Sequence, residues 1–306
     1  TPVAEDLGAS TGTAGLMISL PALLAAVFAP LVVIAAGGID RRRILCALLG
    51  LLLVANLASA LAPGIGWLLA ARVLVGFCMG GIWAIAGGLA ARLVPAQRMG
   101  LATSIIFGGV AAASVLGVPL GALIGDALGW RSAFVALALF SAAVMLLHLR
   151  VVPALPVSTS VRLRQFVQQL GQRDLRRGLW LTVLLVSGHF IAFTYVRPLL
   201  TSVSSVDASW IGALLFAYGL AGIAGNFIAG PLAARHPRGT LLAIASGLLL
   251  TPLLLLWLGG TPSGGIAVLL LWGLAANFLI SVVVVLVFTT RLAADLRARE
   301  RELARL

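Results

Sequence analysis

The chain has 306 residues, of which 61% are apolar and only 10% charged, and its formal net charge is +12. A soluble domain of this size needs a charged surface that this composition cannot supply, so the composition excludes an ordinary soluble globular protein. The positive charge does not indicate nucleic-acid binding, because the arginines lie in short gaps between apolar runs. We therefore expect an all-α membrane protein, with the bilayer as its solvent and no nucleic-acid partner.

The apolar runs have the length of membrane spans. A run of about 18 or more apolar residues crosses a hydrocarbon core of about 30 Å as a helix. Nine such runs occur, at residues 12–36, 44–62, 67–91, 100–124, 131–149, 178–200, 209–233, 239–259 and 264–290. The sequence predicts about nine transmembrane helices, divided by a polar, basic linker at 150–177 and followed by a charged tail at 291–306.

The positions of the arginines predict an orientation, because positively charged connections stay in the cytoplasm. With the N-terminal segment outside, the connections on the inner side hold 18 of the 21 arginines. These connections are residues 37–43, 92–99, 150–177, 234–238 and 291–306. The sequence therefore predicts a cytoplasmic linker and a cytoplasmic tail.

The two halves of the chain show a weak internal repeat. Asp40-Arg41 aligns with Ala234-Arg235 at an offset of 194 residues, and Gly76 aligns with Gly273 at nearly the same offset. A repeat of this length predicts two similar bundles, residues 1–149 and 178–290, related by an axis along the membrane normal. If the halves are equal six-helix bundles, one helix is expected before the first residue and two after the last.

Four segments resemble the major facilitator superfamily, in particular its bacterial drug:proton antiporter branch, whose members export nucleosides, sugars and drugs. GGIDRRRIL (37–45) is similar to the family's loop motif. Residues 68–95, 114–134 and 187–200 resemble family helices four, five and seven. The sequence departs from the loop motif at Arg43 and Ala234, and after about Ala275 it no longer resembles the family.

The resemblance implies a secondary active transporter in the cell inner membrane. It would export a small polar solute by proton antiport with alternating access, as a monomer in the lipid bilayer, with no cofactor, metal or catalytic residue. One alternative is a truncated or frame-shifted remnant that inserts without transport activity. A membrane-embedded enzyme is a further alternative, but the three histidines are too dispersed along the predicted spans to form one site.

Two sets of residues are candidates for the solute cavity. Arg72 lies one or two turns into a span, so it is either an arginine that reaches the outer interface or a charge that faces the cavity. His189, Phe193 and Arg197 share a helical stripe, with Tyr195 beside it. This stripe predicts either a solute-binding surface or an interfacial belt with one buried histidine.

The other candidates depend on the resemblance. It implies that Trp83 and Phe107 line the cavity, although packing between helices also explains large side chains in spans. It implies that Asp40 and Arg41 bridge to a neighbouring helix and lock one state. It also implies that Gly117, Pro119 and Gly121 bend a helix that seals the cavity, for which close helix packing is the simpler explanation.

Overall fold

The computed structural model describes residues 2–156, 164, 168 and 171–275, and within these ranges the chain is helical with no β-strand. The chain divides into two compact units. Unit 1 comprises residues 1–92 and 119–168, and unit 2 comprises residues 93–118 and the chain from 169 onward. The chain therefore passes between the units three times, at residues 92–93, at residues 118–119 within one long helix, and at residues 168–169 near the end of the predicted linker.

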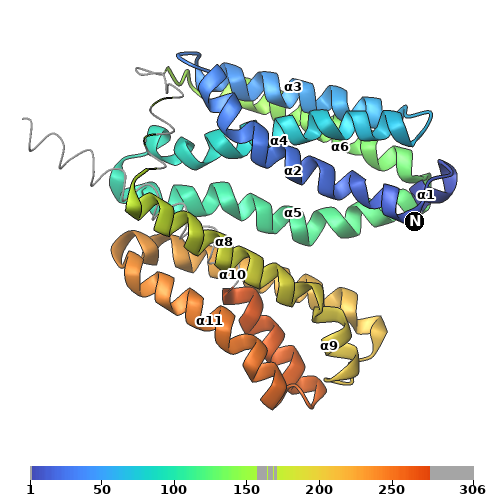
Figure 1. The fold of residues 1–306 in the computed structure, drawn as a ribbon, viewed down its shortest axis with the longest axis vertical. Helices are drawn as coiled ribbons and strands as arrows, with labels where there is room; N and C mark the ends of the chain where they lie inside the picture. Colours follow the sequence, from blue (N-terminus) through green and yellow to red (C-terminus); the bar gives the residue numbers. More distant parts are fainter. Residues whose placement is uncertain (1, 157–163, 165–167, 169–170, 276–306) are drawn as a thin grey trace, which may run out of the picture. The chain divides into compact units, whose positions relative to one another are not determined.

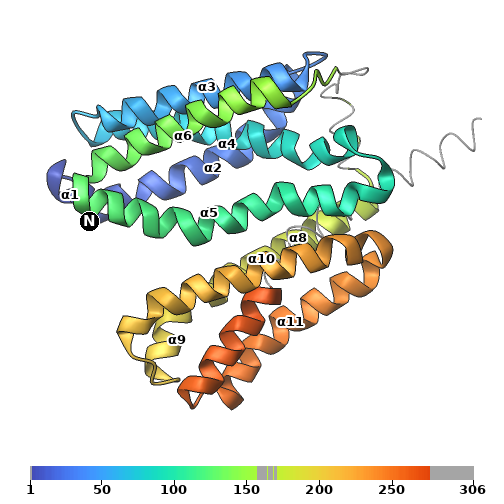
Figure 2. The ribbon, with the colours of Figure 1, turned by 180° about the vertical axis from the view of Figure 1, so that it is seen from behind.

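Unit 1 is a bundle of helices, of which all but the first are long (Figure 1). They are α1 (Pro2–Asp6), α2 (Thr11–Ala35), α3 (Arg41–Ala60), α4 (Ile65–Leu93), the second part of α5 (Met99–Leu128) and α6 (Trp130–Val151). A short 3-10 turn, η1 (Ala96–Arg98), precedes α5. In both views α3 and α6 run side by side (Figures 1 and 2).

Polar side chains and glycine define where these helices begin. The Ser10 hydroxyl accepts a hydrogen bond from the backbone N–H of Thr13 at 3.1 Å at the start of α2. Asp40 does the same for Arg42 at 2.8 Å at the start of α3. Such caps satisfy backbone donors that have no partner inside the helix. Gly129 precedes α6 with φ of 83°, which a residue with a side chain rarely adopts.

Glycines in α4 allow two helix backbones to approach each other closely. A Cβ atom at Gly76 would lie 2.8 Å from Leu24 Cβ, and one at Gly80 would lie 2.6 Å from the Ala25 carbonyl oxygen. Both neighbours belong to α2. Small residues at such crossings favour association of helices within a membrane. The α2–α4 contact thus depends on glycine at these positions.

Three connections predicted to be cytoplasmic meet at one end of unit 1. The Leu155 N–H donates to the Asp40 carboxylate at 2.9 Å, and the Arg41 N–H donates to the Leu155 carbonyl at 3.1 Å. Arg92 donates to the Pro156 carbonyl at 3.1 Å. The loop before α3, the end of α4 and the segment after α6 therefore lie together, as the alternation of the predicted spans requires.

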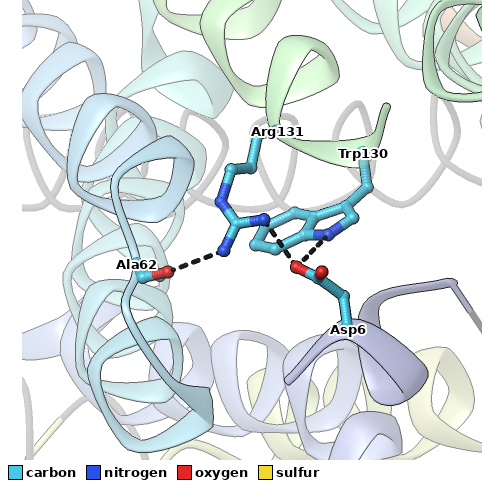
Figure 3. Close-up of polar contacts among 4 residues, drawn as sticks. All are labelled: Asp6, Ala62, Trp130 and Arg131. Atoms are coloured by element: carbon cyan, nitrogen blue, oxygen red, sulfur yellow. Dashed lines mark hydrogen bonds and ion pairs between the residues drawn. The ribbon is translucent and has the colours of Figure 1, made fainter. Parts of the chain in front are cut away.

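The opposite end of unit 1 gathers the other connections around Arg131 (Figure 3). Its guanidinium donates to the Asp6 carboxylate at 2.5 Å and to the Ala62 carbonyl at 3.2 Å, and it lies 4.2 Å from the centre of the Trp130 ring. The Trp130 indole N–H also donates to Asp6, at 3.1 Å. This cluster joins α1, the α3–α4 connection and the start of α6.

We expect this cluster to lose its ionic contribution in acid. Hydrogen bonds from Arg131 and then from Trp130 lower the pKa of Asp6 below its ordinary value. A lowered folded-state pKa stabilises the fold above the unfolded pKa of about 3.9, and the contribution is lost as the pH falls through the folded pKa. Asp6→Asn should therefore lower the thermal stability slightly at neutral pH and leave it unchanged in strong acid. An equal difference at both pH values would contradict this assignment.

Unit 2 contains the first part of α5, α8 (Arg173–Thr194), α9 (Val196–Ser202), the 3-10 turn η2 (Ala208–Trp210), α10 (Ile211–Arg235), α11 (Pro237–Leu258) and a helix at Pro262–Ala275. The axes of α8 and α9 differ by 41°. Pro198 explains the bend, because a proline has no N–H to donate to the carbonyl four residues earlier.

Each unit contains a glycine that lies close to a neighbouring helix. Gly76 of α4 lies against Leu24 of α2, and Gly273 lies against the backbone of Tyr218 in α10. Leu24 and Tyr218 are 194 residues apart, which is the offset read from the sequence. A close contact between two helices at glycine is thus present in both units.

The number of spans differs from the predicted nine. Among the described residues, six helices are long and apolar enough to cross a membrane, or seven if α8 and α9 form one bent span. Two shorter apolar helices, Leu101–Gly117 and Pro262–Ala275, correspond to the fourth and ninth predicted runs. The count of nine is therefore not confirmed. The rest of the ninth run and the tail at 291–306 lie outside the described residues.

Cysteine labelling tests which end of unit 1 faces the cytoplasm. In a variant lacking Cys46 and Cys78, a cysteine at Gly38 should react only with a membrane-permeant maleimide in intact cells. A cysteine at Gly64 should also react with an impermeant reagent. Labelling of Gly38→Cys by the impermeant reagent would reverse the predicted orientation.

Candidate functional site

Four aromatic side chains from three helices of unit 2 form one cluster. His189 stacks on Phe193 at 5.7 Å between ring centres, both on α8. Phe193 lies 5.0 Å from the ring of Tyr218 on α10. The Trp272 ring meets His189 edge-on at 6.1 Å. Stacked and edge-on contacts of this kind are favourable, and an exposed face within such a cluster can also bind a flat solute.

Two further predicted residues, Tyr195 and Arg197, lie at and beyond the bend that ends α8 and are not part of this cluster. Tyr195 is 61% exposed, and Arg197 is also exposed, on α9. The prediction that His189, Phe193 and Arg197 share one stripe requires a continuous helix. The helix is interrupted between Phe193 and Arg197. His189 and Phe193 therefore contact each other on α8, whereas Arg197 lies beyond the break.

Arg72 belongs to α4 in unit 1 and contacts residues of α3 and α6. Its guanidinium donates to the Ser59 hydroxyl at 2.5 Å and lies 4.7 Å from the centre of the Phe134 ring. Only 9% of the side chain is exposed, and its Nε atom has no hydrogen-bond partner in the described part of the chain. Arg72 is thus a buried cation held by a hydroxyl and an aromatic face, rather than an arginine extended into solvent.

Asp40 and Arg41 organise the end of unit 1 predicted to be cytoplasmic. The two Asp40 oxygens accept from the backbone of Arg42 and of Leu155, so one carboxylate begins α3 and fixes the chain after α6. Arg41 is 7% exposed, and Arg42 donates to the Leu149 carbonyl on α6. Asp40 is therefore bound to a neighbouring segment and is more than a residue of a solvated loop.

The remaining predicted residues lie on α4 and α5. A Cβ atom added at Gly117 or Gly121 would meet nothing within 4 Å, so the close packing expected there is found at other glycines. Pro119 lies between them within α5, so the helix continues through it. Trp83 on α4 is 42% exposed, whereas Phe107 on α5 is 5% exposed.

One buried polar contact in unit 2 joins two helices through a partner that the sequence did not identify. The Ser104 hydroxyl donates to the Asn226 carbonyl at 3.0 Å, and the Asn226 amide donates to the Ser104 carbonyl at 2.6 Å. Both residues are at least 98% buried. Gly108 leaves room for the amide, since a Cβ there would lie 3.2 Å from it. The reciprocal pair fastens the first part of α5 to α10.

The described residues contain no group of three or more histidine, cysteine, aspartate or glutamate side chains that could hold a metal ion. A shallow groove of about 340 Å³ runs along the first turns of α8 and is lined by Arg176, Leu179, Trp180 and Val183. It contains none of the predicted site residues. The aromatic cluster and the Arg72 environment therefore remain the strongest candidates for function.

A family model described as Major Facilitator Superfamily matches residues 1–299 of this chain, so the expectation that the resemblance ends at about Ala275 was wrong. The chain belongs to the major facilitator superfamily. Its helical architecture and its loop motif at Asp40 agree with that assignment. It is therefore a multi-pass membrane transporter, as the resemblance implied.

Two known proteins are similar to this major facilitator chain. It is 30% identical over 275 residues to the purine ribonucleoside efflux pump NepI of Salmonella paratyphi A, and the alignment covers 90% of this chain and 69% of that relative. It is also similar to the structure of the human organic anion transporter MFSD10 (TETRAN), with a TM-score of 0.70 and 21% identity, over 93% of this chain and 74% of that one. The second likeness shows a shared fold alone, because members of one fold carry different cargoes.

Proposed function

We propose that this major facilitator transporter exports a small polar solute across the bacterial inner membrane in exchange for protons. A purine nucleoside is the first candidate, and a sugar or a drug is the alternative cargo. The observation that carries the proposal is the 30% identity to a purine ribonucleoside efflux pump across most of this chain. Transport would proceed by alternating access, in which one bundle rocks against the other around a central site.

The aromatic cluster supports a nucleoside as cargo. His189 and Phe193 lie stacked, and Phe190 lies beside the histidine with 5.2 Å between ring centres. A purine base is flat and apolar on its faces, so it stacks well on such rings. The histidine nitrogens can donate or accept a hydrogen bond at the edge of the base. We therefore assign His189 and Phe193 to solute binding, and Tyr195 and Arg197 to the entrance beyond the bend.

Arg72 supports a role for charge in transport. A buried arginine in a membrane-spanning helix is costly, and such residues mark ion or proton pathways. No carboxylate contacts Arg72 among the described residues. We assign it to the coupling of proton movement to solute movement, with Asp40 and Arg41 as part of the gate on the cytoplasmic side.

Everted membrane vesicles that contain this chain test the proposal. Respiration makes their lumen acidic, and an exporter that exchanges solute for protons then loads solute into the lumen. We expect a radiolabelled purine ribonucleoside to accumulate in energised vesicles, and an uncoupler to abolish the accumulation. The same vesicles with labelled sugars and a cationic drug rank the alternative cargoes. Correct insertion without uptake of any compound would instead support a remnant that does not transport.

A further inference from the structure

Trp272 combines deep burial with an unused hydrogen-bond donor. The side chain is 2% exposed and belongs to the main apolar core of unit 2. Its indole Nε1 atom has no hydrogen-bond partner among the described residues. The neighbouring His189 also has an unsatisfied atom, because its buried Nδ1 lacks a hydrogen-bond partner among the described residues. Two unsatisfied polar atoms therefore belong to two rings that contact each other.

This arrangement is costly in a membrane-spanning domain. A buried donor without a partner destabilises a protein by about 1–3 kcal/mol, because its hydrogen bond to water is lost on folding. The hydrocarbon around the domain offers no replacement. Phenylalanine would fill much of the same space without this cost. The indole N–H of Trp272 is therefore better explained by a partner outside the described part of the chain.

The chemistry of the two atoms indicates what that partner is. The indole N–H can only donate a hydrogen bond, whereas an unprotonated histidine Nδ1 can accept one. A hydroxyl group does both, because it accepts from one atom and donates to the other. The two rings meet edge-on with 6.1 Å between their centres, so the two polar atoms belong to side chains that are direct neighbours.

We propose that Trp272 is a specificity-determining residue that, together with His189, binds one hydroxyl group of the exported solute. The solute class is a hydroxyl-bearing molecule with a flat ring, of which a ribonucleoside is the simplest example. The ring stacks within the cluster of His189 and Phe193 while the hydroxyl bridges Trp272 and His189. This inference rests on the proposed function, and it adds the group by which the transporter distinguishes its cargo.

Binding measurements on the full chain in lipid nanodiscs test this inference. The probes are adenosine, guanosine and inosine, each compared with its 2′-deoxy and 3′-deoxy counterparts. The wild type should bind the ribonucleosides at least about tenfold more tightly than one of the deoxy series, because a site that hydrogen-bonds a hydroxyl rejects the analogue that lacks it. Trp272→Phe keeps an aromatic ring and removes the donor, so this discrimination should disappear while binding of the deoxy compound is unchanged.

Two controls separate this role from simple packing. Trp257→Phe makes the same chemical change at a residue that is 89% exposed, and it should alter neither affinity nor discrimination. At His189, the asparagine variant places an amide near the Nδ1 position and should retain part of the discrimination. The glutamine variant places its amide near Nε2 and should lose it. The His189 pair also keeps the test decisive if Trp272→Phe does not fold.

The outcomes distinguish this inference from the proposed function. Equal weakening of ribonucleosides and deoxy compounds by Trp272→Phe, or loss of thermal stability alone, would mean a packing role or a bound water and would overturn the inference. Tight binding by the wild type without discrimination would overturn it too, and would leave the proposed export of nucleosides intact. No binding of any nucleoside by a folded wild type would refute the nucleoside cargo itself, and the inference with it.

Discussion

Replacing Gly80 with alanine should destabilise the transporter, although alanine is the better helix former. The added Cβ would lie 2.6 Å from the Ala25 carbonyl oxygen and 2.9 Å from the Ala29 nitrogen, so it would meet the backbone of α2. A backbone cannot rotate away as a flexible side chain can, and α4 must move instead. Overpacking of this kind costs about 1–3 kcal/mol. In detergent, the temperature at which half of the protein is no longer monodisperse should be lower for Gly80→Ala than for the wild type. The decrease should be larger for Gly80→Val.

Gly121→Ala is the matched control, because a Cβ there meets nothing within 4 Å. Its effect should be close to zero or slightly stabilising, since glycine within a helix is less favourable than alanine by about 0.5–1 kcal/mol. The two substitutions are chemically identical and should differ in sign. Equal effects at Gly80 and Gly121 would contradict the close contact of α2 with α4.

Arg72→Met should separate stability from transport. Methionine resembles the arginine side chain in length, and removing a buried charge that has no carboxylate partner also removes the cost of burying that charge. The thermal stability of the variant should therefore be at least that of the wild type. Uptake driven by the proton gradient should fall by at least about tenfold, equivalent to about 1.4 kcal/mol, because the charge assigned to coupling is gone.

Two further measurements test whether the charge of Arg72 is needed for coupling. Arg72→Lys keeps the charge but loses the planar group that contacts both Ser59 and Phe134, so it should retain part of the uptake. Solute exchange without a proton gradient should survive better than gradient-driven uptake in Arg72→Met. Normal gradient-driven uptake by Arg72→Met would assign the arginine to packing alone.

The positions of the helices, and the connections that share one end of unit 1, followed from the sequence because both depend on local patterns. Apolar runs of span length gave the positions of α2, α3, α4 and α6 to within a few residues. Positive charge at Arg41 and Arg92 predicted which connections share a side, and the contacts with Leu155 and Pro156 place these segments of unit 1 at one end.

The sites were less accessible to sequence reasoning because they depend on contacts between distant helices. Asn226 reads as one polar residue in an apolar run, and only the fold shows that Ser104 is its partner. Trp272 reads as an ordinary apolar residue, although its unpaired indole N–H lies beside His189. One signal was present and was not used. Pro198 follows the cluster closely and predicts the break that separates Arg197 from it.

The most direct test of the proposed exchange is proton movement driven by the solute itself. Proteoliposomes that contain the full chain and a pH-sensitive dye in the lumen are diluted into a purine ribonucleoside. Entry of the solute in exchange for protons should make the lumen more alkaline, and Arg72→Met should abolish that change. A correctly inserted wild type that admits the labelled ribonucleoside without any change in luminal pH would contradict proton exchange.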